Sequence, residues 1–531
     1  MKRKLLSMMA LAALTLLPQG AWADATKTLT PETDVLYSLM TTGDFGTDNG
    51  DGTFTKDGIV YEKSSVSNND DNHDPKWWRY QANSAYIGCP LESALAAGDV
   101  IEITARASSA SSSLYFILRD NTSSEVVETD INVALGSTSE KTYTYTVTAG
   151  DNLVGKSKIY LMANFPSGQS YKIRVGLIRV LRNRTTPNPI TRSTTWDFTE
   201  YNTASETTAP IVCDNLYFGT GIQIMNQKVD GDYNVVNLNG AKGAEDDTHS
   251  LIFYVPAGSG KFTIEFIPNS GNSSSHSKGK KAYYKIGDND PVLMEYTSGK
   301  TLNTLSDVAY NVATATPIML YTTATGQYLI KSISVTPNAP TIPITTIDYA
   351  TFSSPLDLDF SACSQKAYIV TGESAGTLTY QQVTKVPAGT GLLLVGAAGE
   401  NVTPAILSDD ADDVTGNLLK PTLTATTVGT TEGADYGKVF ILGNKGGVPG
   451  FYKSDNGRSL VVGKAYLYLE SGISEAREFF AFNFGDGETT GIYVPSDNLN
   501  AKANYFDLQG RKVAQPTKGL YIVNGKKVVI R

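Results

Sequence analysis

Short segments in which apolar and polar residues alternate recur along most of this 531-residue chain. In residues 101–106 every second residue is apolar, the pattern of a strand that is buried on one face only. Only 18% of the residues are charged, while the chain has 48 glycines and 29 tyrosines, a balance that favours strands and turns over helices. These features predict an all-β protein built from antiparallel β-sandwich modules.

Proline-rich segments at residues 185–189 and 339–343 divide the chain. We therefore expect several modules, each long enough to bury its own core. They are a first β-sandwich at residues 24–184, a second at 190–337, a third β domain at 345–492 and a short C-terminal β tail at 503–531.

The second predicted module repeats part of the first. The triplets Ile-Tyr-Leu at 159–161 and Ile-Arg-Val at 178–180 return as Ile-Met-Leu at 318–320 and Ile-Ser-Val at 333–335. Two tandem sandwiches of one ancestry explain this echo. The cysteines, Cys89, Cys213 and Cys363, each fall in a different module, which excludes a disulfide within a module. We expect buried apolar thiols, with a bridge between modules or a reactive thiol as the alternatives.

The N-terminus has the pattern of a secretory signal peptide at residues 1–23. Lys2, Arg3 and Lys4 precede an apolar stretch at 5–17, and Ala-Trp-Ala at 21–23 is a small-residue cleavage site. The apolar stretch is shorter than the roughly 18 to 20 residues that span a bilayer, and no later segment reaches that length. We therefore expect an extracellular or outer-surface location, with no transmembrane segment in the mature chain.

The C-terminal segment 505–531 predicts three β runs, with an Asn-Gly hairpin turn at 524–525 before the last. It contains Tyr-Phe-Asp-Leu-Gln-Gly-Arg-Lys-Val at 505–513 and Gly-Leu-Tyr-Ile-Val at 519–523, and it ends in a lysine-rich strand. This order resembles the C-terminal sorting domain of Bacteroidota type IX secretion. The resemblance implies that the secretion machinery is a partner of the tail.

Two further resemblances concern the modules. Lys-Ala-Tyr-Ile-Val at 366–370, echoed as Lys-Ala-Tyr-Leu-Tyr at 464–468, occurs in a domain that resembles an accessory β domain found before such tails. By resemblance that domain is a spacer or stalk. The two N-terminal modules resemble, in strand pattern and size, the carbohydrate-binding sandwiches that secreted Bacteroidota proteins carry in tandem.

Motifs for catalysis are scarce in the sequence. His73, His249 and His276 lie among polar residues in predicted loops, and none belongs to a zinc-ligand pattern. No Gly-x-Ser-x-Gly elbow occurs. A net charge of −9 argues against nucleic acid as a partner. We expect no cofactor other than a structural Ca²⁺, for which the loop acids Asp70, Asp71 and Asp74 are candidate ligands, with solvated surface charge as the alternative.

One group of residues suits a ligand. Trp77, Trp78, Arg79 and Tyr80 put flat aromatic faces beside a cation and hydrogen-bonding groups, which is the set that a sugar ring needs. Adjacent residues of a strand point to opposite faces, so one tryptophan is expected in the core. The other, with Arg79 or Tyr80, would form a binding platform.

These residues support three hypotheses. The first is a non-catalytic, secreted or surface-attached protein that binds a glycan or another host or cell-surface ligand. The second is an adhesin or structural scaffold that binds proteins. The third is a polysaccharide-degrading enzyme whose catalytic residues the sequence does not reveal.

Overall fold

The computed structural model describes most of the chain between residues 26 and 530. The described residues are 26–40, 46–56, 59–67, 77–108, 115–123, 131–135, 137–165, 172–239, 249–268, 281–322, 327–345, 347–374, 376–430, 433, 435–454, 457–470, 479–482, 505–506, 512–513, 519–523 and 526–530. The predicted signal peptide lies outside them. Within these ranges one 3-10 helix, Phe198–Glu200, accompanies 45 strands, so the all-β prediction is confirmed.

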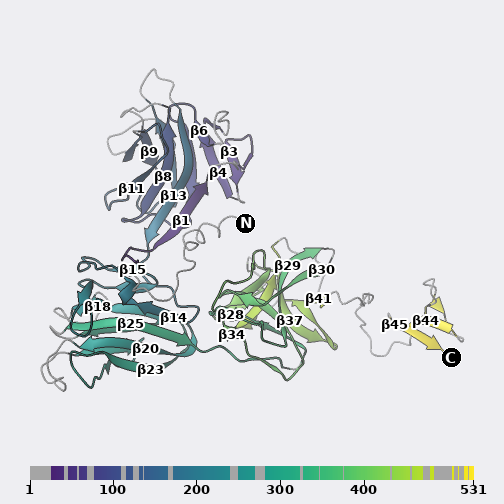
Figure 1. The fold of residues 1–531 in the computed structure, drawn as a ribbon. Helices are drawn as coiled ribbons and strands as arrows, with labels where there is room; N and C mark the ends of the chain where they lie inside the picture. Colours follow the sequence, from purple (N-terminus) through teal and green to yellow (C-terminus); the bar gives the residue numbers. More distant parts are fainter. Residues whose placement is uncertain are drawn as a thin grey trace. The chain divides into compact units, whose positions relative to one another are not determined.

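The chain divides into two compact units, whose strands are labelled in Figure 1. The first unit comprises Met1–Pro340 with two short segments, Pro355–Asp357 and Ile406–Asp410. The second comprises Thr341–Ser354, Leu358–Ala405 and Ala411–Arg531. Among the residues described, no helix is both long and apolar enough to cross a membrane.

The first sandwich has two antiparallel sheets. One sheet has the order β11-β8-β13-β6-β5, with β1 also paired to β13, and the other has the order β10-β9-β12-β7-β4-β3-β2. Alternation along β8, Val100–Ala107, turns Ile101 and Ile103 inward, where they join one core with residues of the other sheet such as Leu161. The remaining strands are β1 (Thr33–Met40), β2 (Thr47–Asp48), β3 (Thr53–Lys56), β4 (Ile59–Ser64), β5 (Val66–Ser67), β6 (Trp78–Tyr80), β7 (Tyr86–Pro90), β9 (Tyr115–Arg119), β10 (Ile131–Ala134), β11 (Lys141–Thr146), β12 (Lys158–Asn164) and β13 (Ile173–Asn183).

The second sandwich has the same strand connections. Its sheets have the orders β17-β18-β25-β20-β23, with β14 paired to β25, and β15-β16-β19-β24-β21-β22. Thus β25 takes the place of β13, β20 that of β8 and β18 that of β6, and the echoed triplets lie in equivalent strands. The strands are β14 (Thr194–Asp197), β15 (Ile211–Cys213), β16 (Leu216–Phe218), β17 (Gln223–Gln227), β18 (Tyr233–Asn239), β19 (Leu251–Val255), β20 (Gly258–Pro268), β21 (Ala282–Ile286), β22 (Val292–Leu293), β23 (Asn303–Val312), β24 (Thr316–Thr322) and β25 (Gln327–Pro337).

The second unit contains two larger antiparallel sheets, β27-β32-β29-β30 and β35-β40-β37-β38-β41. Both contribute to one core, with Val370 of β29 and Leu467 of β40 in the same cluster. Its strands are β26 (Ile342–Pro343), β27 (Tyr349–Phe352), β28 (Leu358–Asp359), β29 (Lys366–Ser374), β30 (Thr377–Val383), β31 (Lys385–Val386), β32 (Leu392–Val395), β33 (Asn401–Val402), β35 (Leu419–Thr422), β36 (Thr426–Val428), β37 (Val439–Lys445), β38 (Val448–Lys453), β39 (Arg458–Leu460), β40 (Lys464–Tyr468) and β41 (Phe479–Ala481). The short strand β34 (Ala405–Ile406) lies at the boundary, with Ile406 in the first unit.

The C-terminal tail forms a four-stranded antiparallel sheet of order β43-β42-β44-β45, one strand more than the sequence predicted. Its strands are β42 (Tyr505–Phe506), β43 (Lys512–Val513), β44 (Gly519–Val523) and β45 (Lys526–Ile530). Val523 pairs with Lys526, so two residues connect β44 to β45, as the Asn-Gly turn predicts.

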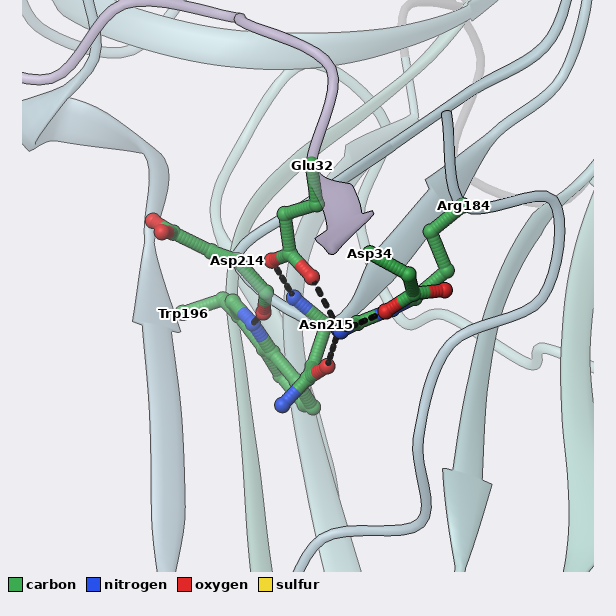
Figure 2. Close-up of polar contacts among 6 residues, drawn as sticks. All are labelled: Glu32, Asp34, Arg184, Trp196, Asp214 and Asn215. Carbon is green, nitrogen blue, oxygen red and sulfur yellow. Dashed lines mark hydrogen bonds and ion pairs between the residues drawn. The ribbon is translucent and has the colours of Figure 1, made fainter. Parts of the chain in front are cut away.

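Within the first unit, Arg184 joins the end of the first sandwich to a hairpin of the second (Figure 2). Its guanidinium donates to Glu32 at 2.5 Å, to Asp34 at 2.6 Å and to the side-chain oxygen of Asn215 at 3.2 Å. Asp214 and Asn215 are the two turn residues between β15 and β16, and both have positive φ (51° and 55°), as a two-residue hairpin turn of the I′ type requires. The backbone N–H of Asn215 also donates to the carboxylate of Glu32 at 2.6 Å, so this carboxylate connects the two sandwiches.

The cysteines are free thiols. Cys89 and Cys213 are buried in the cores of the first and second sandwich, and Cys363 of the second unit is half-buried. Burial raises the pKa of Cys89 to about 12 and that of Cys213 to about 11. The two buried cysteines therefore act as small apolar core residues.

Candidate functional site

The four residues of the predicted binding group lie on both faces of one sheet. Trp78 and Tyr80 of β6 point into the core of the first sandwich, where Trp78 is 3% exposed and its ring centroid lies 4.4 Å from that of Phe54. Tyr80 is fully buried and its hydroxyl donates to the carbonyl of Leu161. Trp77 and Arg79 lie on the opposite, outer face.

Trp77 lies flat against the sheet at a β-bulge in β13. The register between β13 and β8 shifts at Gly176, and a Cβ added to Gly176 would lie 3.0 Å from two ring carbons of Trp77. Glycine is thus needed for this close approach. Arg106 covers the indole from above, with its guanidinium carbon 4.9 Å from the ring centroid. Trp77 is consequently only 6% exposed, and its ring packs between Gly176 and the guanidinium of Arg106.

Three arginines lie side by side on this outer face. Arg174 of β13 is directly opposite Arg79 of β6 on one side and directly opposite Arg106 of β8 on the other. These three residues, which we call the arginine row, are all half-buried. Directly opposite side chains project from the same face of a sheet, and neighbouring strands are about 4.8 Å apart, so the row places three guanidinium groups across about 10 Å.

Hydroxyl and amide groups border the arginine row. Ser67 of β5 is opposite Arg79, and the side-chain amide of Gln81 donates to the hydroxyl of Ser67. Thr104 of β8 and Thr142 of β11 share a hydrogen bond of 2.9 Å on the same outer face. The face therefore combines cationic donors with neutral groups that both donate and accept.

The next cationic residue along β13 is differently placed. Arg179 is opposite Glu102 of β8 and forms an ion pair with it. On the same outer face, Arg179 is thus opposite a carboxylate, whereas the residues of the arginine row are opposite other arginines.

A small pocket lies at another edge of the first sandwich. It has a volume of about 90 Å³ and is lined by Gly46, Asp48, Phe54, Lys63, Val66, Ser67 and Trp78. Lys63 donates to Asp48 at 2.7 Å and holds the pKa of that carboxyl below its usual value. Water occupies about 30 Å³ per molecule, so this pocket has room for about three waters, whereas pockets that enclose a ligand measure roughly 300 Å³ or more. We therefore take the outer face with the arginine row as the candidate site.

The candidate calcium ligands Asp70, Asp71 and Asp74 lie outside the described residues, as do His73 and His276. Among the residues that the structure does describe, no group of three or more acids, histidines and cysteines is placed to hold a metal ion. His249 is half-buried at the residue that precedes Ser250 and β19.

Sequence reasoning identified Trp77 and Arg79 of this site but missed Arg106 and Arg174. The alternation of residues 101–106 placed Arg106 on a polar face, but the sequence assigned no face to Arg174. It did not give the register that brings them beside Arg79.

No protein-family model matches the chain, and no curated protein matches it. Among solved structures, the chain is similar to the tandem CBM22-1–CBM22-2 domain of Paenibacillus barcinonensis Xyn10C, with 9% identity over 58% of this chain and 98% of that one and a TM-score of 0.22. It is also similar to the Podospora anserina GH26-CBM35 β-(1,4)-mannanase, with 13% identity over 30% of each chain and a TM-score of 0.16. A third is the Clostridium perfringens ZmpB M60 catalytic domain with its CBM51-1 and CBM51-2 domains, with 10% identity over 58% of this chain and 38% of that one and a TM-score of 0.15. At these scores the likenesses carry no argument, and the function is argued from the residues of the site.

Proposed function

We propose that the chain is a non-catalytic glycan-binding protein of the cell exterior, and that it binds glycan on the outer face of the first sandwich. The observation that carries this proposal is the arginine row, in which Arg106 stacks on the ring of Trp77 and which hydroxyl groups border. Guanidinium groups donate in a fixed planar fork, which suits pairs of oxygens such as those of a sugar or a sugar acid.

The chemistry of this face suits binding better than catalysis. Glycoside hydrolysis needs two carboxyl groups across the scissile bond. On the described part of this face, the carboxylate of Glu102 is held by Arg179, and the guanidinium groups of the arginine row are hydrogen-bond donors.

The ends of the sequence supply the cellular setting of the proposal. A signal peptide at residues 1–23 would export the chain, and the tail at 503–531 would engage a secretion machinery that releases it or fixes it to the cell surface. The second sandwich and the third β domain would then separate the binding face from the tail along the chain. A structural Ca²⁺ held by Asp70, Asp71 and Asp74 belongs to the same proposal.

A glycan array probed with the full chain, with and without EDTA, tests the function. We expect selective retention on a subset of polysaccharides, and loss of that retention in an R79A/R106A/R174A variant that still folds. Loss of binding in EDTA would support the calcium site. Absence of binding to all plant, host and microbial glycans would overturn the proposal in favour of a protein-binding adhesin or scaffold. Release of reducing-end or unsaturated products from a bound polysaccharide would instead show an enzyme.

A further inference from the structure

We propose that residues 26–32 form a detachable strap that closes the core of the second sandwich, and that release of this strap opens the core at Cys213. The strap immediately precedes β1, so by its place in the chain it belongs to the first sandwich. Its contacts, however, connect it to the second. The inference concerns a conformational switch within the first unit, and it holds whether or not the chain binds glycan.

The backbone of the strap is bonded to the second sandwich at both ends. The N–H of Lys27 donates to the carbonyl of Glu200 at 3.0 Å, and the carbonyl of Lys27 accepts from the N–H of Asn202 at 2.7 Å. At the other end the N–H of Glu32 donates to the carbonyl of Val212 in β15 at 2.7 Å. The chain thus pairs with the second sandwich before it enters the first.

The side chains of the strap alternate as they do in a strand. Lys27 and Leu29 are half-buried, whereas the residues on either side of each are exposed. Leu29 packs against the apolar core of the second sandwich. The ammonium of Lys27 lies 3.1 Å from the carboxylate of Glu200. One edge of the strap therefore closes the core, and the other faces solvent.

The strap covers the thiol of Cys213. This cysteine is the last residue of β15, belongs to the core of the second sandwich and is 5% exposed. Its thiol donates to the carbonyl oxygen of Thr28 in the strap, with 3.9 Å between sulfur and oxygen. In the first sandwich, by contrast, the thiol of Cys89 donates to the carbonyl of Ile87 in its own strand, β7. Release of the strap should therefore uncover Cys213 and leave Cys89 buried.

The contacts of the strap are weak enough for it to leave while both sandwiches stay folded. The side chains of Lys27 and Glu200 are 40% and 49% exposed, and ion pairs between such groups contribute little. A segment with one solvent-facing edge opens more easily than a strand such as β25, which is paired with β18 on one side and β20 on the other. Beyond the strap, β1 keeps its own pairing with β13 from Thr33 onward.

Docking of the strap adds a second connection between the two sandwiches. The segment 185–189 leads from β13 into the second sandwich, and the strap leads from the second sandwich back into β1. Glu32, the last residue of the strap, is the carboxylate to which both Arg184 and the backbone of Asn215 donate (Figure 2). The docked strap therefore restrains the sandwiches at both places where the chain crosses between them, and release leaves one of these.

Thiol labelling of the full chain under native conditions tests the strap. Leu29→Asn removes the apolar contact with the core, and Thr30→Asn is the matched control, because it puts the same side chain at the neighbouring exposed residue. Modification of Cys213 and of Cys89 is followed by mass spectrometry of the peptides that contain them. Hydrogen exchange in β20 and β25 shows whether the second sandwich remains folded.

In the parent chain we expect Cys213 to be modified at least about tenfold faster than Cys89, because opening the strap costs less than unfolding the first sandwich. Leu29→Asn should speed modification of Cys213 by a further factor of about ten, with Cys89 and the exchange in β20 and β25 unchanged. Thr30→Asn should have no effect. Lys27→Ala should give a smaller increase, and it keeps the test valid if the Leu29 variant does not fold.

A synthetic peptide of residues 25–32 tests the docking place directly. Added to the Leu29→Asn chain, it should occupy the place that the strap has left and slow the modification of Cys213. The same peptide carrying Leu29→Asn should not.

Three results would overturn the inference. Equal rates for Cys213 and Cys89 in every variant would show that only global unfolding uncovers Cys213. Faster exchange in β20 and β25 of the Leu29→Asn chain would make Leu29 a fixed part of the core. A peptide that does not slow the modification, or an equal effect of Thr30→Asn, would show that the second sandwich has no separate docking place for the strap.

Discussion

Replacing Arg184 by alanine should destabilise the first sandwich more than the loss of any surface ion pair. Arg184 is 20% exposed at its side chain and donates to Glu32, which is 27% exposed, and to Asp34, which is 49% exposed. The substitution removes both ion pairs and the bond to Asn215, and it leaves two carboxylates facing each other's negative charge (Figure 2).

The expected loss can be worked out contact by contact. A partly buried charge-assisted bond such as that to Glu32 contributes about 1.5 kcal/mol, and the half-exposed pair with Asp34 about 0.5 kcal/mol. The total is about 2 kcal/mol. For a domain of this size 1 kcal/mol corresponds to roughly 2–4 °C, so the melting temperature should fall by about 4–8 °C.

Differential scanning calorimetry of the full chain measures this shift. A Leu161→Ala variant, which creates a cavity in the same core, identifies the transition that belongs to the first sandwich. Lys158→Ala is the matched control, since Lys158 and its partner Glu62 are 43% and 40% exposed and their pair should contribute at most about 0.5 kcal/mol. If Arg184→Ala lowers the transition no further than Lys158→Ala does, the contacts of Arg184 do not stabilise the sandwich and the reasoning fails.

Two further predictions concern single groups. Thiol labelling of the native chain near pH 8 should modify the half-buried Cys363 first and leave Cys89 unmodified until the chain unfolds, because burial raises the pKa of Cys89 to about 12; equal labelling rates would contradict this. Asp412 accepts from the backbone amides of Lys385 and Thr384, and these bonds hold its pKa below the usual value. Its charge therefore stabilises the fold above about pH 4 and the contribution is lost as the pH falls through the lowered pKa, so Asp412→Asn should cost about 1 kcal/mol in urea titrations at pH 7 and progressively less as the pH falls below about 4; a cost that does not change with pH would refute it.

The fold could be predicted from the sequence because its signals are local. Period-two alternation such as that of residues 101–106 specifies a strand and its buried face, and β8 follows it residue by residue. The echoed triplets identified equivalent strands, since Ile178 and Ile333 occupy the same place in β13 and β25. In the tail the sequence predicted three β runs with a turn at residues 509–510, and the count was one strand short because two-residue strands such as β42 and β43 carry no periodicity.

The arginine row could not be predicted in the same way, because it depends on contacts between strands distant in sequence. Arg79, Arg106 and Arg174 become neighbours only once the pairings of β13 with β6 and with β8 are fixed. The same pairing shows that the tryptophan on the outer face is Trp77, a choice between Trp77 and Trp78 that strand alternation left open. The bulge at Gly176 and the side chain of Arg106 enclose its ring, which no local pattern reports.

The bulge itself shows how one fold yields two different surfaces. In the first sandwich Gly176 is the residue of β13 that β8 leaves unmatched, and in the second sandwich the equivalent unmatched residue of β25 is Lys331. Gly176 leaves room for Trp77, on which Arg106 rests, whereas the ammonium of Lys331 donates to Glu265 of β20 at 3.0 Å. The second sandwich therefore neutralises a cation within its own sheet at the place where the first builds a support for positive charge. The two sandwiches share the strand order and the place of the unmatched residue, so the difference at this place lies in the side chains, which is where divergent selection for a ligand would act.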